Sequence, residues 1–509
     1  MNTKLKSVCA AIAMAFCTGH AVAAGTLIPA TAPQDMVYDA QRKLIYVTDA
    51  TQVLRYDVTT GKFLSPITLG GNLYGIDLSP DGTTLAVGDA TSTTVNSTTN
   101  LVIHQVSLPS LVDTPALFPL STQLFGSGTW AVAYGGNGDL MASVSLDGSG
   151  YTAMLEYTAS KKTWSVLSPF MQSSMLATSG NGRIIAFVEP NNSGGPFGFL
   201  NDVSNKLNEY QLGGFIYEVA TNVSGDQIAL IGGGSVDVYT NGTGGYAFPG
   251  IGGVYDPVRP VAYFTQPNST NVIAYNMNNL TKRTVYDLNT TFAHPGVFGF
   301  GNGRTRISLD GSLLMAVGND GVHYLQLYAP LAVAPVAATT TSGNAVALTA
   351  AGSLGIAGTL TYELPGKPAH GTATVNGNVV TYVPDSGFVG TDTFGYRVLY
   401  ERAFANGTMS VTVTAAASAL GLADATMTLH TRSPVLVPVL VNARGADNQS
   451  LHIVAVKQPA HGRATIQGEQ ILYAPPDQRD SSETLEYTVS DGHGRMATGH
   501  TTVRVTNAN

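Results

Sequence analysis

Three ionisable residues occupy matching positions of a repeated sequence pattern and could therefore act together. Asp35, Glu218 and Arg304 each lie one residue inside an apolar segment that recurs along the chain. Neighbouring carboxylates can hold a metal ion or exchange a proton with a substrate. Two carboxylates facing one guanidinium more often form a structural ion pair, because a hard divalent cation takes six or more oxygen ligands. We therefore predict an ion pair, with a catalytic site as the alternative.

The residues that start these segments are suited to binding a polar polymer. Aligning the repeats gives a first set, made of Gln34, Tyr74, Trp130, Ser174, Tyr217, Ile251 and Gly303. The next position gives a second set, made of Asp35, Gly75, Ala131, Met175, Glu218, Gly252 and Arg304. Aromatic rings stack on the apolar faces of sugars, and small polar groups bind hydroxyls. We predict a ligand-binding rim containing Gln34, Tyr74, Trp130, Ser174, Tyr217, Asp35, Glu218 and Arg304; the alternative is that these residues only plug the interior.

Other catalytic arrangements have little support in the sequence. The repeat region contains His104, His294 and His323, and none of them falls in either set. A lyase would need a histidine as its proton carrier. No Gly-x-Ser-x-Gly elbow lies between a strand and a helix, so no Ser-His-Asp triad is predicted. We predict no catalytic residues, no metal site and no cofactor, with calcium at carboxylates such as Asp385 and Asp392 as an alternative.

Seven copies of one pattern position the two sets. Each copy between Pro33 and Leu331 is an apolar run, a tight turn and a second apolar run. The turns are Ala40-Gln41, Pro80-Asp81-Gly82, Gly136-Asn137-Gly138, Gly180-Asn181-Gly182, Ser224-Gly225-Asp226, Pro257-Val258 and Leu309-Asp310-Gly311. Asn-Gly and Asp-Gly supply the positive φ that a tight hairpin requires. The flanking runs are short and rich in β-branched and aromatic residues, so they are predicted strands.

Third and fourth strands follow in several copies, as at Gln52–Asp57 and after Thr59–Gly61. Four short antiparallel strands repeated seven times predict a seven-bladed β-propeller, in which each unit buries its apolar face on its neighbour. The segments Ile45–Asp49 and Leu54–Gly61 resemble YVTN-type surface-layer propellers. The Ser79–Gly82 turn is shared with WD40-like and TolB-like propellers. This resemblance implies the fold and leaves the function open, because propellers host unrelated activities.

Propeller lactonases of the gluconolactonase type hold a metal ion with several inward carboxylates. The second set offers only Asp35 and Glu218 for that role, with Arg304 as their counter-charge. A lactonase-like hydrolase or lyase acting in the central channel is therefore the alternative function.

The C-terminal part contains a second, longer repeat. Pro368–Thr374 recurs as Pro459–Thr465, and His370 and His461 are 91 residues apart, a length that suits one small β-sandwich. The segments around them, including Gly387–Val398, resemble the bacterial Ig-like, cadherin-like repeats, which act mostly as spacers or adhesive modules. Both histidines are predicted to bond the local backbone in a turn.

The second copy departs from this pattern where the first has Gly-Phe-x-Gly-x-Asp. It has Arg479–Ser482 there, so no role of Asp392 is carried over to it. The stretch Ala329–Ser342 is rich in Ala, Pro and Thr, and it is predicted to be a linker after the propeller.

Composition and the N-terminus indicate an exported protein. Charged residues make up only 11% of the chain and its net charge is −8, which argues against nucleic-acid binding. Lys4 and Lys6, the apolar stretch Val8–Phe16 and the small residues Ala21–Ala23 form a predicted signal peptide, and no membrane span is predicted. Both cysteines, Cys9 and Cys17, lie inside it, with lipid attachment at Cys17 as an alternative.

The predicted protein is all-β: a signal peptide at 1–23, a seven-bladed β-propeller at 24–332, and tandem Ig-like β-sandwich domains at 333–415 and 416–509. We predict a binding, adhesion or surface-scaffold protein of the periplasm, cell surface or extracellular space. Its propeller rim would recognise an extracellular glycan or protein, with the Ig-like domains as spacers. The oligomeric state is left open.

Overall fold

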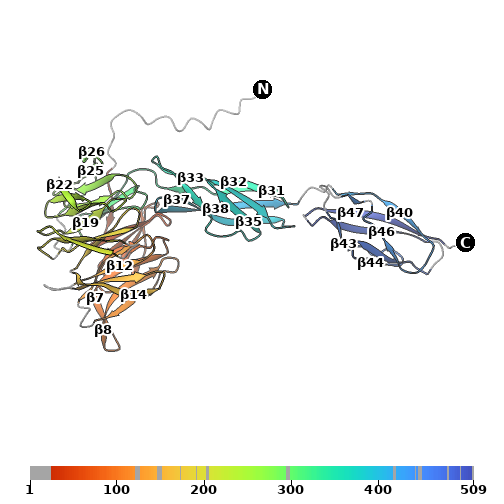
Figure 1. Cartoon of the computed structure of the whole chain (residues 1–509), viewed down its shortest axis with the longest axis horizontal. Helices are drawn as coiled ribbons and strands as arrows, with labels where there is room; N and C mark the ends of the chain where they lie inside the picture. The colour runs from red at the N-terminus through yellow and green to blue at the C-terminus, as the bar shows by residue number, and fades with distance from the viewer. Residues whose placement is uncertain are drawn as a thin grey trace, which may run out of the picture. The chain divides into compact units, whose positions relative to one another are not determined.

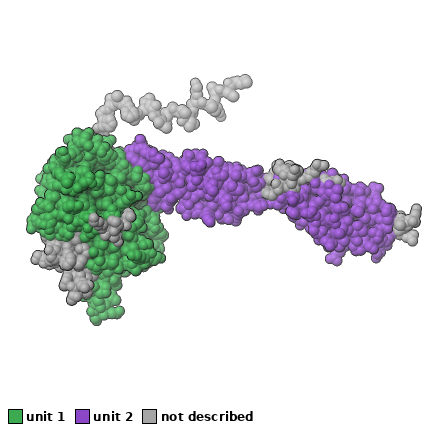
Figure 2. All heavy atoms as spheres, viewed as in Figure 1, with its two compact units in different colours: residues 1–330, 401–403 green, residues 331–400, 404–509 purple. Residues whose placement is uncertain are grey.

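The computed structural model describes residues 24–120, 126–145, 152–171, 173–190, 192–201, 206–293, 299–415, 420–441, 443–444, 450–477, 481–492 and 494–506. The predicted signal peptide, with both cysteines, and His294 lie outside these residues. The chain divides into two compact units, residues 1–330 with 401–403 and residues 331–400 with 404–509 (Figure 2). Within the described ranges, no helix is long and apolar enough to cross a membrane.

The first unit is a β-propeller whose described residues form seven antiparallel sheets (Figure 1). Blades 1 to 3 consist of β2 (Pro33–Asp39), β3 (Leu44–Asp49), β4 (Gln52–Asp57) and β5 (Lys62–Thr68); β6 (Leu73–Leu78), β7 (Thr84–Val95), β8 (Thr98–Ser107), β9 (Val112–Asp113) and β10 (Ala116–Pro119); and β11 (Gly128–Tyr134), β12 (Leu140–Ser145), β13 (Thr152–Thr158) and β14 (Thr163–Met171).

The remaining four blades have four strands each. They consist of β15 (Met175–Thr178), β16 (Ile184–Val188), β17 (Pro196–Asn201) and β18 (Lys206–Gln211); β19 (Glu218–Thr221), β20 (Gln227–Ile231), β21 (Ser235–Thr240) and β22 (Thr243–Pro249); β23 (Gly252–Tyr255), β24 (Val261–Thr265), β25 (Asn271–Asn276) and β26 (Thr281–Asp287); and β27 (Thr305–Ile307), β28 (Leu313–Val317), β29 (Gly321–Gln326) and β1 (Thr26–Pro29).

The seven sheets close into a ring. The first strands of successive blades contact one another in the order β2, β6, β11, β15, β19, β23 and β27, and β27 contacts β2 again. Strand β1 pairs antiparallel with β29, from Thr26↔Tyr324 to Pro29↔Gly321, so the N-terminal strand completes the last blade. The predicted propeller is confirmed, and each predicted turn joins the first two strands of a blade.

The apolar core lies between neighbouring blades. Where blades 1 and 7 meet, Met36 and Ile45 pack with Leu313 and Met315 in one buried cluster. Burying such a side chain contributes about 1.5–3 kcal/mol, so the ring is held together by packing between sheets that could not each fold alone.

The turns Ala40-Gln41 and Pro257-Val258 follow the same Val-Tyr-Asp sequence, and in both a buried aspartate bonds the backbone of the turn. The carboxylate of Asp39 accepts the N–H groups of Gln41 and Arg42 and the side chain of Arg42 at 2.7 Å. Asp256 accepts the N–H groups of residues 258 and 259 and the Nε of Arg259 at 2.8 Å. Each acid thus holds its turn with an arginine three residues later.

The second unit contains two β-sandwiches with the same topology. The first has sheets β31-β38-β37-β34 and β32-β36-β35, built from β31 (Val336–Thr341), β38 (Ala403–Thr414), β37 (Gly390–Tyr400), β34 (Thr361–Glu363), β32 (Val346–Thr349), β36 (Val379–Pro384) and β35 (Gly371–Asn376). A two-stranded sheet joins β30 (Ala332–Val333) and β33 (Gly352–Ser353). In both sandwiches the first strand of the four-stranded sheet runs parallel to its neighbour.

The second sandwich has sheets β40-β47-β46-β43 and β41-β45-β44. Its strands are β40 (Ala425–Leu429), β47 (Met496–Val505), β46 (Ser481–Ser490), β43 (His452–Val456), β41 (Val435–Val437), β45 (Gln470–Ala474) and β44 (Arg463–Gln467), with the small pair β39 (Gly421–Leu422) and β42 (Ala443–Arg444).

The predicted linker at 329–342 is wrong. Most of it forms β30 and β31, and β31 pairs with β38 from Val336↔Met409 to Thr341↔Thr414. Residues of β31 alternate between half-buried and exposed positions, as expected for a strand at the edge of a sheet. Alanine and threonine are suited to half-buried and exposed positions of an edge strand. Because the segment lacks the bulky apolar residues of a central strand, its composition alone indicates a linker.

The acid of the first sandwich has a counterpart in the second. Buried Asp392 accepts the N–H groups of Ala369 (3.2 Å) and His370 (2.7 Å) and the hydroxyl of Tyr382 (3.0 Å). Glu483 stands the same distance after His461 as Asp392 after His370, and its carboxylate contacts the Nδ1 of His461 at 2.6 Å. The Gly-Phe-x-Gly-x-Asp sequence is absent from the second copy, and the acid at the equivalent position bonds the histidine ring, whereas Asp392 accepts backbone N–H groups.

Both histidines were predicted to bond the local backbone in a turn, but their rings make other contacts. The ring of His370 stacks on Phe388, with centroids 4.4 Å apart, and the ring of His461 bonds Glu483. Their main chains make the turn contacts: the carbonyl of His370 accepts the Tyr382 hydroxyl at 2.9 Å, and that of His461 accepts the Tyr473 hydroxyl at 3.4 Å.

Candidate functional site in the propeller channel

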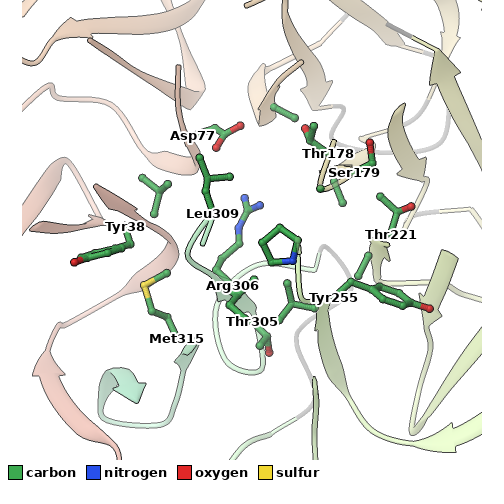
Figure 3. A pocket seen from close by; sticks show the side chains of 18 of the residues that line it. Tyr38, Asp77, Thr178, Ser179, Thr221, Tyr255, Thr305, Arg306, Leu309 and Met315 are labelled. Carbon is green, nitrogen blue, oxygen red and sulfur yellow. The ribbon is translucent and has the colours of Figure 1, made fainter. Parts of the chain in front are cut away.

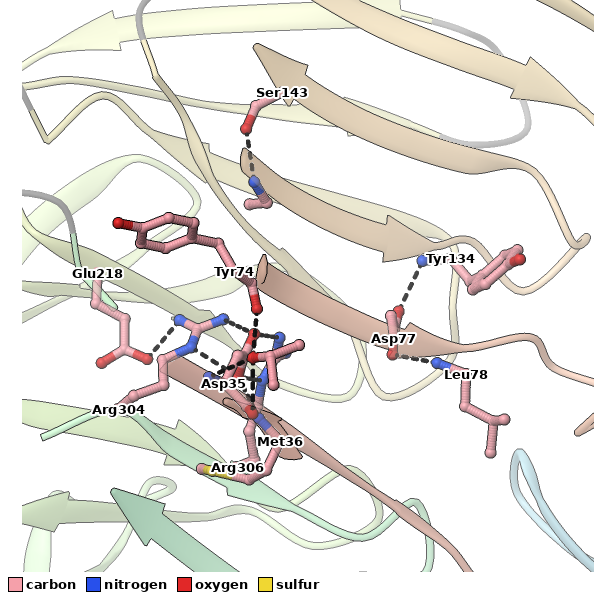
Figure 4. A network of polar contacts seen from close by, with 12 residues as sticks. Asp35, Met36, Tyr74, Asp77, Leu78, Tyr134, Ser143, Glu218, Arg304 and Arg306 are labelled. Atoms are coloured by element: carbon pink, nitrogen blue, oxygen red, sulfur yellow. Dashed lines mark hydrogen bonds and ion pairs between the residues drawn. The ribbon is translucent and has the colours of Figure 1, made fainter. Parts of the chain in front are cut away.

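The three ionisable residues of the second set meet inside the central channel. Arg304 donates from Nη1 to Oε1 of Glu218 (2.6 Å) and from Nε to Oδ1 of Asp35 (3.2 Å) (Figure 4). Asp35, Glu218 and Arg304 are 0%, 1% and 2% exposed. The predicted ion pair is therefore present, and it joins blades 1, 5 and 7.

A second arginine, which the sequence reading missed, completes this charged cluster. Arg306 donates from Nε and Nη2 to the two carboxylate oxygens of Asp35, at 2.9 and 2.6 Å. It lies two residues after Arg304 on β27. Side chains of a strand point to the same face at every second residue, so the position two residues beyond the second set also faces the channel.

That rule identifies a third set, which lines a cavity near the distal end of the channel, where the innermost strands finish. Its members are Val37, Asp77, Ala133, Ala177, Ala220, Val254 and Arg306. The cavity has a volume of about 130 Å³, and Figure 3 shows Asp77 and Arg306 among its lining side chains. The sequence analysis did not single out Asp77, because the blade 2 residue of the second set is Gly75, which has no functional group.

Burial and the two arginines set the protonation of the three acids. Burial alone would raise the pKa of Asp35, but the charges and hydrogen bonds of Arg304 and Arg306 hold it below its ordinary value. Burial raises the pKa of Glu218 to about 7, and Arg304 offsets only part of that effect. Burial also raises the pKa of Asp77, whose carboxylate accepts the N–H groups of Leu78 (3.0 Å) and Tyr134 (2.8 Å).

This arrangement fits neither a metal centre nor a free general base at Asp35. Both oxygens of Asp35 are engaged by guanidinium groups. Among the residues that the structure describes, no three His, Cys, Asp or Glu side chains are grouped to hold a metal ion. Asp392, one of the acids considered for calcium, directs its carboxylate at backbone and tyrosine donors instead.

Aromatic residues close the proximal end of the channel, where the innermost strands begin. The rings of Tyr74 and Trp130 stack with centroids 4.1 Å apart, and Phe300 contacts both edge-on at 5.4 and 5.3 Å. Phe300 lies in the segment that leads into β27, which is anchored by the N–H of Gly301 donating to the carbonyl of Gln34 (2.9 Å). The sequence reading missed Phe300 because it lies outside the seven turns and both sets.

Gly299 lets this segment cross the channel mouth. Its φ is +74°, and a Cβ there would lie 2.0 Å from the carbonyl oxygen of Tyr217. Only glycine tolerates both that conformation and that approach.

Burial divides the predicted rim into two groups. Trp130 is 6% exposed and Ser174 is fully buried, so both form part of the interior. Gln34, Tyr74 and Tyr217 remain partly exposed. Tyr217 lies beside Phe215, which is 48% exposed, and their nearly parallel rings (11°) have centroids 6.4 Å apart. Phe215 was missed because it precedes the first set by two residues.

The two propeller histidines that the structure describes, His104 and His323, contact nearby aspartates. His104 is buried between Asp113, whose carboxylate lies 2.7 Å from Nδ1, and Asp89, whose carboxylate lies 3.5 Å from Nε2. Burial lowers the pKa of His104, but the hydrogen bonds and charges of Asp113 and Asp89 outweigh it and raise the pKa to about 9. The Nε2 of His323 contacts Asp320 at 2.8 Å.

Comparison with protein families supports the description of the second unit as two Ig-like domains. The bacterial Ig domain family matches residues 328–430 and 416–506, which confirms two tandem Ig-like domains and suggests a surface or extracellular protein. No curated protein matches the chain significantly. A propeller followed by Ig-like domains fits a binding or scaffold protein in general terms.

Several solved structures resemble the chain at low identity. A chain of the mitotic checkpoint complex is 14% identical with a TM-score of 0.46, covering 65% of this chain and 98% of that one. Hydrazine synthase of Kuenenia stuttgartiensis is 13% identical with a TM-score of 0.44, and the match covers 59% of this chain and 97% of that one. The β-propeller domain of Cps50 (Swd1) from Myceliophteria thermophila is 9% identical with a TM-score of 0.41 (59% and 99%).

Proposed function

We propose that this chain is an exported binding or surface-scaffold protein whose propeller recognises an extracellular glycan or protein. The binding surface is the proximal face, with Phe215, Tyr217 and Tyr74 as its aromatic contacts. The Ig-like domains act as spacers. The observation that carries the proposal is the pair of parallel, partly exposed rings of Phe215 and Tyr217 beside the closed channel mouth.

Parallel rings on a rigid face suit recognition of a polymer. A large aromatic side chain that stays half-exposed in the free protein loses little conformational entropy on binding and covers a large apolar area. The neighbouring Gln34 supplies a side-chain amide that can hydrogen-bond hydroxyl or peptide groups. Both glycans and peptide segments offer such groups next to apolar surface.

The charged cluster favours binding over hydrolysis. A lactonase-like enzyme would need carboxylates available for a metal ion or a water molecule. In this channel Asp35 is held by both arginines and one oxygen of Glu218 by Arg304. These contacts support a structural role in joining blades 1, 5 and 7.

The proposal is tested by binding of the full-length protein to arrays of cell-envelope glycans and to extracellular proteins. The double variant Phe215→Ala, Tyr217→Ala is expected to bind at least tenfold more weakly, since loss of an aromatic contact at the centre of an interface costs 1.4 kcal/mol or more. Its melting temperature should stay close to wild type, because Phe215 is half-exposed.

Tyr246→Ala is the matched control. Tyr246 is 63% exposed on the outer strand β22. The substitution therefore removes a comparable aromatic ring that lies away from the proximal face. Equal binding by the double variant and by the control would contradict the proposed surface.

A further inference from the structure

The cavity near the distal end of the channel exists because one side of the third set is made of small residues. Ala133, Ala177 and Ala220 stand on three successive blades, where a larger side chain would fill the space. Asp77 and Arg306 stand on blades 2 and 7. The lining therefore combines an apolar wall with the acids Asp77 and Glu218 and the arginines Arg304, Arg306 and Arg402. An apolar wall with a few polar groups is typical of a small-molecule site.

One deeply buried polar atom at this cavity lacks a partner. Glu218 lines the cavity and is 1% exposed. Its Oε1 accepts from Arg304, whereas its Oε2 has no hydrogen-bond partner among the described residues. A buried carboxylate oxygen without a donor is unfavourable, and a ligand that donates to it would remove that cost.

Arg306 supplies a donor at the same cavity. Its Nε and Nη2 are engaged by Asp35, and its side chain is 22% exposed, with the guanidinium directed into the space seen in Figure 3. A ligand in this cavity meets an acceptor at Glu218, an acceptor at Asp77 and a donor at Arg306. It must therefore donate and accept hydrogen bonds within a short distance.

Charge and size narrow the ligand further. With Glu218 ionised, the acids Asp35, Asp77 and Glu218 balance the arginines Arg304, Arg306 and Arg402 in formal charge, and all of these except Asp35 line the cavity. A charged ligand would add an uncompensated charge to a buried site. A volume of about 130 Å³ is close to the cavity of about 150 Å³ that holds one benzene, so it accommodates about six non-hydrogen atoms.

We propose that this cavity is a binding site for a small neutral polyol with adjacent hydroxyl groups. One hydroxyl donates to Oε2 of Glu218 or to Asp77, and its neighbour accepts from Arg306. The carbon chain packs against Ala133, Ala177 and Ala220. The site is separate from the proximal face, so it does not depend on the function proposed above.

Saturation-transfer NMR on the full-length protein tests this site, with glycerol as the probe. Glycerol, which has six non-hydrogen atoms, should receive saturation from the protein. In Ala177→Leu, which fills the cavity, the transfer should fall at least fivefold, whereas Ala247→Leu on the exposed part of β22 should leave it unchanged. Circular dichroism checks that both variants fold, and Ala133→Val replaces Ala177→Leu should that variant not fold.

Further probes distinguish the source and the charge of the ligand. Methyl glucoside should give little transfer because its ring exceeds the cavity, and protonated ethanolamine and acetate should give less than glycerol. Stronger transfer to either ion would overturn the assignment of a neutral ligand. Glycerol transfer that is absent, or unaffected by filling the cavity, would overturn the site itself.

Discussion

Arg304 neutralises buried carboxylates of two other blades inside the channel. It is the largest fully buried side chain in the described part of the chain, and its guanidinium contacts acids from two other blades. A buried ion pair often adds little net stability, yet removing one partner leaves a buried charge and costs about 3–5 kcal/mol. The cluster therefore fixes which blades face one another, because a misplaced blade would leave Asp35 or Glu218 without its counter-charge.

His104 makes the stability of the propeller depend on pH. Its pKa is raised to about 9 in the folded protein, against about 6.5 in the unfolded chain. The stabilisation is therefore fully present below pH 6.5 and is lost as the pH rises to about 9. We predict that His104→Gln lowers the free energy of unfolding by on the order of 2 kcal/mol at pH 6, and by much less at pH 9.5.

Urea unfolding followed by tryptophan fluorescence measures this effect. Both tryptophans, Trp130 and Trp164, lie in the propeller, so the signal reports this unit alone. A difference between wild type and variant that stays constant from pH 6 to 9.5 would refute the account of His104.

Part of the charged cluster could be predicted at this scale. Asp35, Glu218 and Arg304 were found because they share one position of the repeat. Arg306 and Asp77 were missed although they lie two residues further along the same strands, where the alternation of a strand returns to the channel. Burial of Trp130 could not be read from the sequence, because it depends on Phe300 and the segment that carries it across the channel mouth.

Among the elements, β1 closes the ring. Ile28 is fully buried in the cluster between blades 1 and 7, whereas Leu27, its neighbour on the same strand, is 36% exposed. We predict that Ile28→Ala lowers the stability of the propeller by about 2–4 kcal/mol, as expected for truncation of a core residue. Leu27→Ala should cost less than about 1 kcal/mol. Urea unfolding of the two variants, followed by tryptophan fluorescence, gives the comparison.

Equal effects of the two substitutions would mean that β1 does not bury Ile28 between blades 1 and 7 as the outer strand of blade 7. The sequence alone did not predict β1, since Thr26–Pro29 is short and lies far in sequence from the strand it pairs with. The seven turns were predicted correctly because glycine, asparagine and aspartate favour tight hairpins through local conformation. Pairings between distant segments leave no such local signal, which is also why the composition of β31 predicts a linker.

At the scale of the whole molecule, the two units differ in what they offer a partner. The propeller combines a channel closed by aromatic residues, a proximal face with the rings of Phe215 and Tyr217, and a small polar cavity. The second unit repeats one sandwich topology twice, and Tyr382, Asp392, Tyr473 and Glu483 bond the turns that carry His370 and His461. This difference supports the proposal that the propeller carries recognition and that the Ig-like domains act as spacers.

Hydrogen exchange of the full-length protein, with and without the glycan or protein that it captures, tests this assignment most directly. The account predicts slower exchange in the partner complex at residues 212–217 and 299–304 of the proximal face, with exchange at β22 and in the Ig-like domains unchanged. Protection confined to residues 331–400 and 404–506, with the proximal face exchanging as in the free protein, would contradict it.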